Sequence, residues 1–148
     1  MIDPKIYEER NFHGVKGLVF IDEKILVYRR DNKTKSFPLC IDLPGGGKEN
    51  NETPFATFKR ELKEEFNLKL AESDVVYAKQ YLSAMDESKE SYFIVTKNLS
   101  AQKTDIALGN EGLEYYLMSV DEYLKLNDAI GRQQTKVEQY LLDILKNN

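Results

Sequence analysis

The chain has 148 residues, of which 41% are hydrophobic and 31% charged, and its formal net charge is −4. This length fits one domain, residues 1–148, and the composition excludes a disordered tail. The mild negative charge, without a long Lys/Arg run, argues against duplex nucleic acid as a partner. One cysteine and one histidine exclude an intrachain disulfide and a Cys/His zinc site. Because no apolar run spans a membrane and the charged N-terminus is unlike a signal peptide, we expect a soluble cytoplasmic protein.

The chain begins with two segments that are typical of a β-hairpin. Residues 15–21 and 24–30 are rich in β-branched and aromatic side chains. The dipeptide Asp22-Glu23 between them reads as the turn, although neither residue is the Gly or Asn that such turns prefer. A short apolar strand then runs into a Gly-rich loop within residues 40–52.

A helix is expected after this loop. Thr53 is a good N-cap, and Pro54 suits the first helical position because its missing N–H costs nothing there. At about 100° per residue, four large apolar side chains fall within a narrow arc, which we expect to face the core. They are Phe55, Phe58, Leu62 and Phe66.

Three further strands and two helices complete the predicted mixed α/β domain. The strands are expected at residues 75–84, 91–98 and 113–118. Ser119 and Glu122 form a capping box that predicts the start of a short helix. Thr135 and Glu138 form a second one, which predicts the start of the final helix. The apolar stripe of the final helix is expected to be Val137, Leu141, Ile144 and Leu145.

Three glutamates, Glu61, Glu64 and Glu65, crowd one side of the central helix. Like charges three or four residues apart destabilise a helix by a few tenths of a kcal/mol per pair. Anions near the C-terminal end also oppose the helix dipole, at roughly 0.3–1 kcal/mol each. Of the helix's basic residues, only Arg60 could reach this arc, at Glu64. The residues are therefore either a solvated face or a site for a cation such as Mg²⁺ or Mn²⁺, which prefer carboxylate oxygens.

The spacing from the Gly-rich loop to this helix is specific. Gly46 is followed after five residues by Glu52 and after seven more by RELKEEFNL, which begins at Arg60. This resembles the Nudix box, G-x5-E-x7-R-E-U-x-E-E-x-G-U, with U a bulky aliphatic residue, at eight of nine specified positions. Asn67 stands where the family has a helix-ending glycine, and Asn is the next best tolerated residue in a left-handed turn. The resemblance implies an α+β fold, an α/β/α sandwich with a mixed β-sheet.

The resemblance also implies a metal-dependent pyrophosphohydrolase that cleaves a nucleoside diphosphate linked to another group, with Mg²⁺ or Mn²⁺ as cofactor. It makes Glu64 and Glu65 direct metal ligands. Glu61 is then a third ligand or the base that activates water. The carbonyl oxygen of Gly45 or Gly46 is the further ligand expected from the loop.

Supporting residues follow from the same resemblance. Arg60 and Glu52 would form an ion pair that orients the glutamates. A later loop supplies another acid in many family members, and here the candidates are Glu111, which we prefer, and Glu114. Substrate phosphates are expected to contact one of two adjacent residues of the hairpin, Arg29 or Arg30, because strand side chains alternate.

The substrate is expected to be a small molecule that contains a nucleoside diphosphate. Signatures of the family's ADP-ribose, NADH and coenzyme A enzymes are absent, and the chain is small, which favours a (deoxy)nucleoside triphosphate. The alternatives are a nucleotide-sugar or dinucleoside-polyphosphate hydrolase, and a catalytically silent Nudix domain that binds a nucleotide and regulates. Homodimers are frequent in this family.

Overall fold

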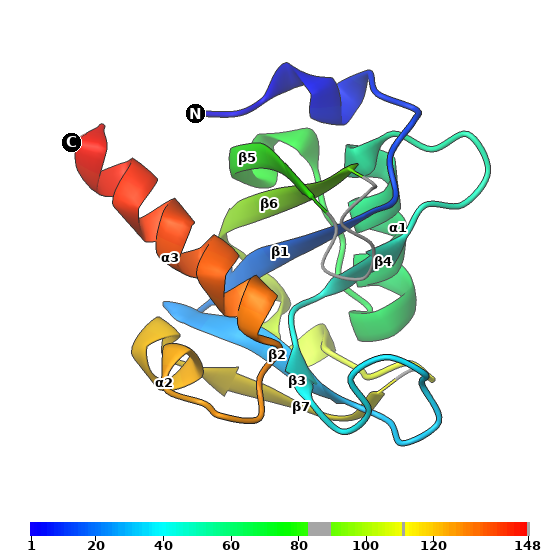
Figure 1. Cartoon of the computed structure of the whole chain (residues 1–148), viewed down its shortest axis with the longest axis vertical. Coiled ribbons are helices and arrows are strands. Elements are labelled where there is room, and N and C mark those ends of the chain that lie inside the picture. Colours follow the sequence, from blue (N-terminus) through cyan, green and yellow to red (C-terminus); the bar gives the residue numbers. More distant parts are fainter. Residues whose placement is uncertain (83–89, 111, 148) are drawn as a thin grey trace.

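The computed structural model describes residues 1–82, 90–110 and 112–147. Its elements follow one another as strands, one helix, more strands and two helices (Figure 1). The strands are β1 (Gly14–Ile21), β2 (Lys24–Arg30), β3 (Ile41–Asp42), β4 (Gly45–Gly47), β5 (Val75–Leu82), β6 (Glu90–Asn98) and β7 (Gly112–Met118). The α-helices are α1 (Pro54–Phe66), α2 (Val120–Leu124) and α3 (Gly131–Lys146). Short 3-10 turns are η1 (Pro4–Tyr7), η2 (Glu72–Asp74) and η3 (Ser100–Asp105).

The strands form one mixed sheet in the order β3-β2-β1-β6-β5, with β7 on β2 and β4 on β1. Strand β1 runs parallel to β6, and the other pairs are antiparallel. Strands β1 and β2 pair only at their hairpin end, where Phe20 faces Ile25 and Ile21 faces Lys24. Beyond that point β4 pairs with Gly14 to Lys16 of β1. Strands β1 and β2 are therefore not hydrogen-bonded to each other between Lys16 and the end of β2.

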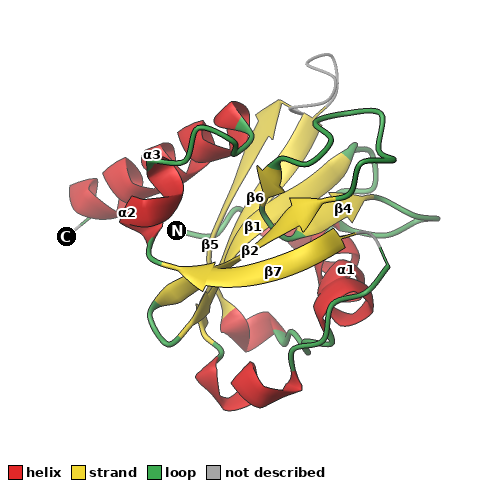
Figure 2. Ribbon diagram, turned by 90° about the horizontal axis from the view of Figure 1, so that it is seen from below, coloured by secondary structure: helices red, strands yellow, loops and turns green. Residues whose placement is uncertain are grey.

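Helices cover both faces of the sheet. Figure 2 shows α1 on one side of the strands and α2 with α3 on the other. One buried cluster lies under α1 and includes Phe58, Leu62 and Phe66. A second lies under α2 and α3 and includes Tyr123 and Val137. This arrangement confirms the predicted α/β/α sandwich with a mixed sheet.

The hairpin turn uses two residues in the left-handed region, Asp22 (φ 52°) and Glu23 (φ 65°). Non-glycine residues rarely adopt this conformation, so other contacts must hold it. The Asp22 amide donates to Asn98 Oδ1 and Ser100 Oγ, each at 2.8 Å, and the Asp22 carboxylate pairs with Lys103 at 2.8 Å. Strand β6 and η3 therefore stabilise a turn whose own residues do not favour it.

The last helix begins earlier than predicted. Helix α3 starts at Gly131, so Thr135 lies within it and donates to the Gly131 carbonyl at 3.2 Å instead of capping. The preceding segment docks on β3: the Ile130 amide donates to the Ile41 carbonyl at 3.1 Å, and Ile130 is buried. Tertiary pairing thus sets the start. The predicted stripe is also partly wrong, because Leu145 is 69% exposed while Tyr140, one turn earlier, is buried.

The other predicted elements agree closely with the structure. The Ser119 hydroxyl accepts from the Glu122 amide at 3.1 Å, which confirms the cap of α2. Strand β5 ends at Leu82, and the last two residues of its predicted range lie outside the described residues. Within the described ranges, the helices are too short or too polar to cross a bilayer.

Candidate active site

Helix α1 forms as its sequence predicts. The Thr53 hydroxyl accepts from the Ala56 amide at 3.2 Å, and the four predicted core residues are buried. Asn67 ends the helix in the left-handed region at φ 56°, which confirms that expectation. Its side chain accepts from Lys63 Nζ at 2.7 Å and donates to the Asp105 carbonyl at 3.0 Å, two bonds that a glycine would lack.

The three glutamates lie along one side of α1, between the Gly-rich strand β4 and the loop before β7. Glu61 is only 7% exposed, and its carboxylate lies over Gly46, where an added Cβ would be 2.6 Å from Glu61 Cδ. The Glu64 side chain is about half exposed. A Cβ on Gly109 would be 3.2 Å from Glu65 Oε2, and the Gly109 amide donates to the Glu65 carbonyl at 2.7 Å. Gly46 and Gly109 thus allow both loops to approach the carboxylates closely.

Arg60 is the centre of the hydrogen bonds around these carboxylates. Its Nε and Nη2 donate to the Glu52 carboxylate at 2.8 and 3.1 Å, a two-point ion pair between the residues predicted to pair. Its Nη1 donates to Glu61 at 3.0 Å and to Glu64 at 3.1 Å, and Nη2 also reaches the Gly47 carbonyl at 2.9 Å. The bond to Glu52 raises the pKa of Arg60. Burial would raise the pKa of Glu52, but Arg60 lowers it below its usual value.

The carboxylates are chemically suited to a divalent cation. Among the described residues, no group of three or more His, Cys, Asp or Glu side chains is arranged to hold a metal ion. Arg60 Nη1 nevertheless lies within 3.1 Å of an oxygen of both Glu61 and Glu64, so these two already share one cationic group. Hard oxygen donors of this kind are those that Mg²⁺ and Mn²⁺ prefer. The carboxylates along α1 therefore have the chemistry to hold such an ion.

A buried ionic cluster, which the sequence analysis missed, adjoins the Gly-rich strand. Asp42 is fully buried and accepts from Lys16 Nζ and Arg30 Nη1, each at 2.9 Å, with the Tyr28 hydroxyl at 3.4 Å. Lys16 Nζ also donates to the Gly45 carbonyl at 3.3 Å. Burial would lower the pKa of Lys16, but Asp42 raises it above its usual value. We call Lys16, Tyr28, Arg30 and Asp42 the Asp42 cluster; a charged residue between Ile41 and Leu43 was its one sequence signal.

The two candidate arginines lie on opposite faces of the sheet. Arg29 faces α3 and binds Asp128 at 3.0 Å, and its guanidinium lies 5.9 Å from the Tyr116 ring centroid. Arg30 is on the α1 face, where it lines a pocket of about 400 Å³. The pocket lies beside the C-terminal end of α1, because its lining residue Asn110 follows Gly109. Its lining is Tyr28, Arg30, Asp31, Lys33, Thr34 and Asn110.

Of the two candidate acids near β7, Glu111 and Glu114, the structure describes only Glu114. Glu111 lies outside the described residues. Glu114 accepts from the Tyr116 hydroxyl at 2.8 Å on the face away from α1, whereas Tyr115 packs beneath α1. The structure therefore does not bring Glu114 to the three glutamates.

Comparison with known proteins agrees with this geometry. The NUDIX domain model matches residues 12–138. The chain belongs to the NUDIX family. A search of curated proteins finds no match. As a NUDIX member, the chain is a hydrolase of pyrophosphate bonds, and its matched region contains the Gly-rich strand, α1 and the Asp42 cluster.

Solved structures of NUDIX proteins share the fold over most of the chain. A MutT protein from Methanosarcina mazei Go1 is 21% identical, with a TM-score of 0.72, and the match covers 92% of this chain and 96% of that one. A C. elegans Ap4A hydrolase is 13% identical, with a TM-score of 0.67 and coverages of 90% and 98%. A Francisella tularensis bifunctional NMN adenylyltransferase/ADP ribose pyrophosphatase, complexed with AMP and a Mn ion, is 20% identical, with a TM-score of 0.61 and coverages of 90% and 41%.

Proposed function

We propose that this NUDIX hydrolase uses Mg²⁺ or Mn²⁺ to cleave a nucleoside diphosphate linked to another group, with a (deoxy)nucleoside triphosphate as its preferred substrate. The observation that carries the proposal is the row of Glu61, Glu64 and Glu65 along α1, in contact with β4 on one side and with the loop at Gly109 on the other. Two of these carboxylates share the guanidinium of Arg60.

In this proposal, Glu64 and Glu65 hold the ion, and Glu61 is either a third ligand or the group that takes the proton from water. The half-exposed Glu64 side chain can turn without moving the core, whereas the buried Glu61 is held over Gly46. A bound divalent ion would neutralise the phosphates and acidify the attacking water. The carbonyl of Gly45 or Gly46 remains the backbone ligand that we propose.

Arg60 and Glu52 are positioning residues in this mechanism. The Glu52 carboxylate holds the guanidinium from one side, so that Nη1 stays directed at Glu61 and Glu64. Removing Glu52 would leave Arg60 free to pair more closely with the glutamates and compete with the metal ion. Such supporting contacts orient the groups that bind metal.

Phosphates of the substrate are proposed to lie near Arg30. Its pocket adjoins the end of α1 that carries Glu65, and Arg30 lines it while its guanidinium donates to Asp42 and Thr34. We propose Arg30 and not Arg29 for this role, because Arg29 contacts Asp128 and Tyr116 on the other face. Glu111, which lies outside the described residues, remains our proposed further acid.

Two other classes of substrate could be cleaved by the same pyrophosphate hydrolysis. One of the structural relatives is an Ap4A hydrolase, which keeps a dinucleoside polyphosphate among the candidates, together with a nucleotide sugar. A catalytically silent nucleotide-binding domain is the remaining alternative. It is disfavoured because a pure binding domain has no use for three acids that destabilise their helix.

The proposal is tested by product analysis. The protein is incubated with Mg²⁺ or Mn²⁺ and nucleoside triphosphates, nucleotide sugars, ADP-ribose or dinucleoside polyphosphates, and the products are identified by chromatography. Glu64→Gln and Glu65→Gln should abolish turnover without unfolding the domain, while Glu138→Gln, on the exposed side of α3, should leave it unchanged. Near-wild-type rates in both site variants would exclude the metal assignment, and binding without turnover across the panel would favour the silent domain.

The expected homodimer, the cytoplasmic location and the single-domain organisation of residues 1–148 stay predictions. Size-exclusion chromatography with light scattering would measure the first of these directly.

A further inference from the structure

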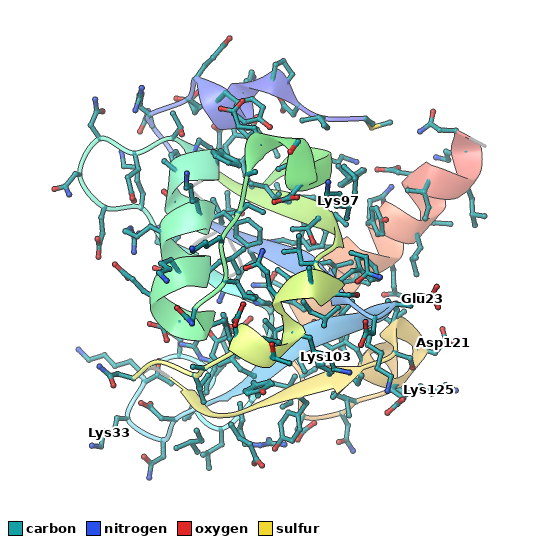
Figure 3. The ribbon with its side chains drawn as sticks, turned by 180° about the vertical axis from the view of Figure 1, so that it is seen from behind. Glu23, Lys33, Lys97, Lys103, Asp121 and Lys125 are labelled. Carbon is teal, nitrogen blue, oxygen red and sulfur yellow. The ribbon has the colours of Figure 1, made fainter. Side chains whose placement is uncertain are left out.

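The two long outer strands of the sheet, β5 and β7, differ in how their outer edges are covered. The Asp3 amide donates to the Ala78 carbonyl of β5 at 3.0 Å, and the Ala78 amide donates to the Met1 carbonyl at 3.2 Å. The short outer strand β3 is also covered, because the Ile130 amide donates to the Ile41 carbonyl at 3.1 Å. Strand β7 pairs with β2 and with no other described strand. Figure 2 shows β7 in front of the other strands with no described helix or strand across it, and Figure 3 shows it along one border of the molecule.

The backbone groups of Tyr115 and Leu117 point away from β2. The Arg30 amide donates to the carbonyl of the residue before β3 at 2.9 Å, so the backbone groups of Arg30 face β3. Because these directions alternate along a strand, the groups of Arg29 face β7, and those of its partner Glu114 face back toward β2. Tyr115 and Leu117 alternate with Glu114 and therefore face outward. Among the described residues, neither the amide nor the carbonyl of either one has a hydrogen-bond partner.

The side chains of β7 offer little protection for this open edge. Its sequence, GLEYYLM, contains no Lys, Arg or Pro, and its one charged residue, Glu114, accepts from the Tyr116 hydroxyl at 2.8 Å. The register shift against β2 lies at the start of the strand, so residues 114–118 pair regularly. Leu113 is 56% exposed. Outer strands of native proteins usually carry lysine, proline, a bulge or a covering segment, so a regular apolar edge is typical of a strand that pairs with another chain.

The strand is complementary to itself in one antiparallel register. When two copies pair about Tyr115, Leu113 lies opposite the partner's Leu117, and Glu114 lies opposite the partner's Tyr116. The Tyr116 hydroxyl already donates to Glu114 within one chain, so the two side chains are chemically matched. Like charges do not meet in this register, whereas pairing about Glu114 would put two carboxylates side by side. A two-fold symmetric dimer requires such a self-complementary surface.

We infer that β7 pairs antiparallel with β7 of a second copy about a two-fold axis at Tyr115, so that one sheet continues through a homodimer. The two Tyr115 residues then exchange amide–carbonyl hydrogen bonds, and the exposed Leu113 side chain is covered. An unrelated peptide would have to bring both an apolar residue for Leu113 and a donor for Glu114, whereas the second copy brings both by symmetry. A pair of short strands buries less than the about 800 Å² per partner of a standard interface, so we expect a dissociation constant of roughly 1–100 µM.

The first test measures the oligomeric state. Sedimentation velocity is recorded without nucleotide at about 1–500 µM protein for the wild type, Leu113→Lys and the control Leu145→Lys. Both variants replace an exposed leucine by lysine, but Leu145 is 69% exposed on α3 and lies outside the proposed interface. Leu113→Lys should raise the dissociation constant at least about 10-fold, because it puts an ammonium group opposite the partner's Leu117. Leu145→Lys should dimerise like the wild type.

The second test measures amide hydrogen exchange by NMR in the wild type, so it stands even if Leu113→Lys does not fold. The Tyr115 amide should exchange at least about 10-fold more slowly at the highest protein concentration than at the lowest, because only the dimer gives it an acceptor. The Tyr116 amide, which faces β2, should be protected at every concentration. The Ala78 amide, which donates to the Met1 carbonyl, should show no dependence on concentration.

The outcomes either support the β7 interface or overturn it. A dimer that is weakened in Leu113→Lys, with slower exchange at Tyr115, would support it. A monomer at all concentrations, whether its Tyr115 amide exchanges rapidly or is protected within one chain, would overturn it. A dimer lost in Leu145→Lys and kept in Leu113→Lys would place the interface on α3 and overturn it as well. These measurements use no nucleotide, so their result is independent of the proposed hydrolase activity.

Discussion

Two charged regions of this molecule lie close together but are built in opposite ways. The first is the acidic side of α1, where Arg60 is bonded to Glu52, Glu61 and Glu64 at the protein surface. The second is the interior Asp42 cluster, where one buried carboxylate serves both Lys16 and Arg30. The first has an excess of carboxylates around one cation, and the second an excess of cations around one carboxylate.

Pairs between a carboxylate and a basic side chain have different roles at the surface of α1 and in the buried Asp42 cluster. In the proposed mechanism, the carboxylates of α1 would gain a metal ion at little structural cost, because the Glu64 side chain is about half exposed. The Asp42 cluster cannot exchange its partners without leaving charges in the core, so it fixes the junction of β1, β2 and β3. The acidic region is suited to binding and releasing ions, and the interior one to holding the strands and loop that carry the site.

The largest expected effect is on the interior region. Asp42→Asn leaves Lys16 and Arg30 buried without a carboxylate, and we expect it to lower the free energy of unfolding by about 3–5 kcal/mol. Urea titration measures this change. The matched control is Asp128→Asn, whose partner Arg29 and own carboxylate are both partly exposed, with an expected loss of about 0–1 kcal/mol. Equal losses in the two variants would show that burial does not distinguish them.

The next prediction concerns pH and Lys136. Its folded pKa of about 8 lies below the ordinary 10.5, so between these values the unfolded chain binds more protons and stability rises with pH. Lys136→Met should be more stable than wild type by up to about 3 kcal/mol at pH 7. That gap should close as the pH approaches 10, as thermal melts of both proteins would show. A gap independent of pH would contradict the prediction. The charged groups that act on Lys136 are Lys16, Asp42 and Arg132, and its Nζ lies over the Tyr81 ring.

The acidic region is best tested through its contact with the Gly-rich strand. In Gly46→Ala the new Cβ would lie 2.6 Å from the Glu61 carboxyl carbon and displace it, so we expect kcat/KM to fall about 10- to 100-fold, or about 1.4–2.7 kcal/mol. Gly47→Ala is the matched control, because its Cβ would meet no atom nearer than 4.0 Å. Steady-state assays with the best substrate give both values. Similar rates in the two variants would mean that the position of Glu61 is unimportant.

The smallest effect is expected at Asn67, the residue that departs from the NUDIX box. Asn67→Gly removes two exposed hydrogen bonds but relieves the left-handed backbone, so its stability should change by less than about 0.5 kcal/mol. Asn67→Ala loses the bonds and keeps the strain, so it should cost about 1 kcal/mol. Thermal unfolding distinguishes them. A large loss in Asn67→Gly would show that the bond to the Asp105 carbonyl is needed to hold the following loop.

The elements that could be predicted are those whose signals lie within a few residues. Helix α1 runs from its predicted cap at Thr53 to its predicted end at Asn67, because its period, its capping residue and its left-handed stop are all local. The start of α3 was predicted wrongly. The helix begins at Gly131, because the hydrogen bond from the Ile130 amide to the Ile41 carbonyl of β3 fixes the residue before it. Thr135 has the sequence of a capping box, but this tertiary hydrogen bond starts the helix earlier and places Thr135 inside it.

The family, the helix with its three glutamates and the pairing of Arg60 with Glu52 could be predicted without the fold, because these residues lie within one loop and one helix. The fold was needed to place Arg30 on the α1 side and Arg29 on the α3 side, and to show that Glu114 points away from α1. It also assembled Lys16, Asp42 and Lys136 from three distant segments. Local periodicity sets which side chains share a helix face, but strand order and register set which distant charges meet, and no short stretch of sequence encodes either.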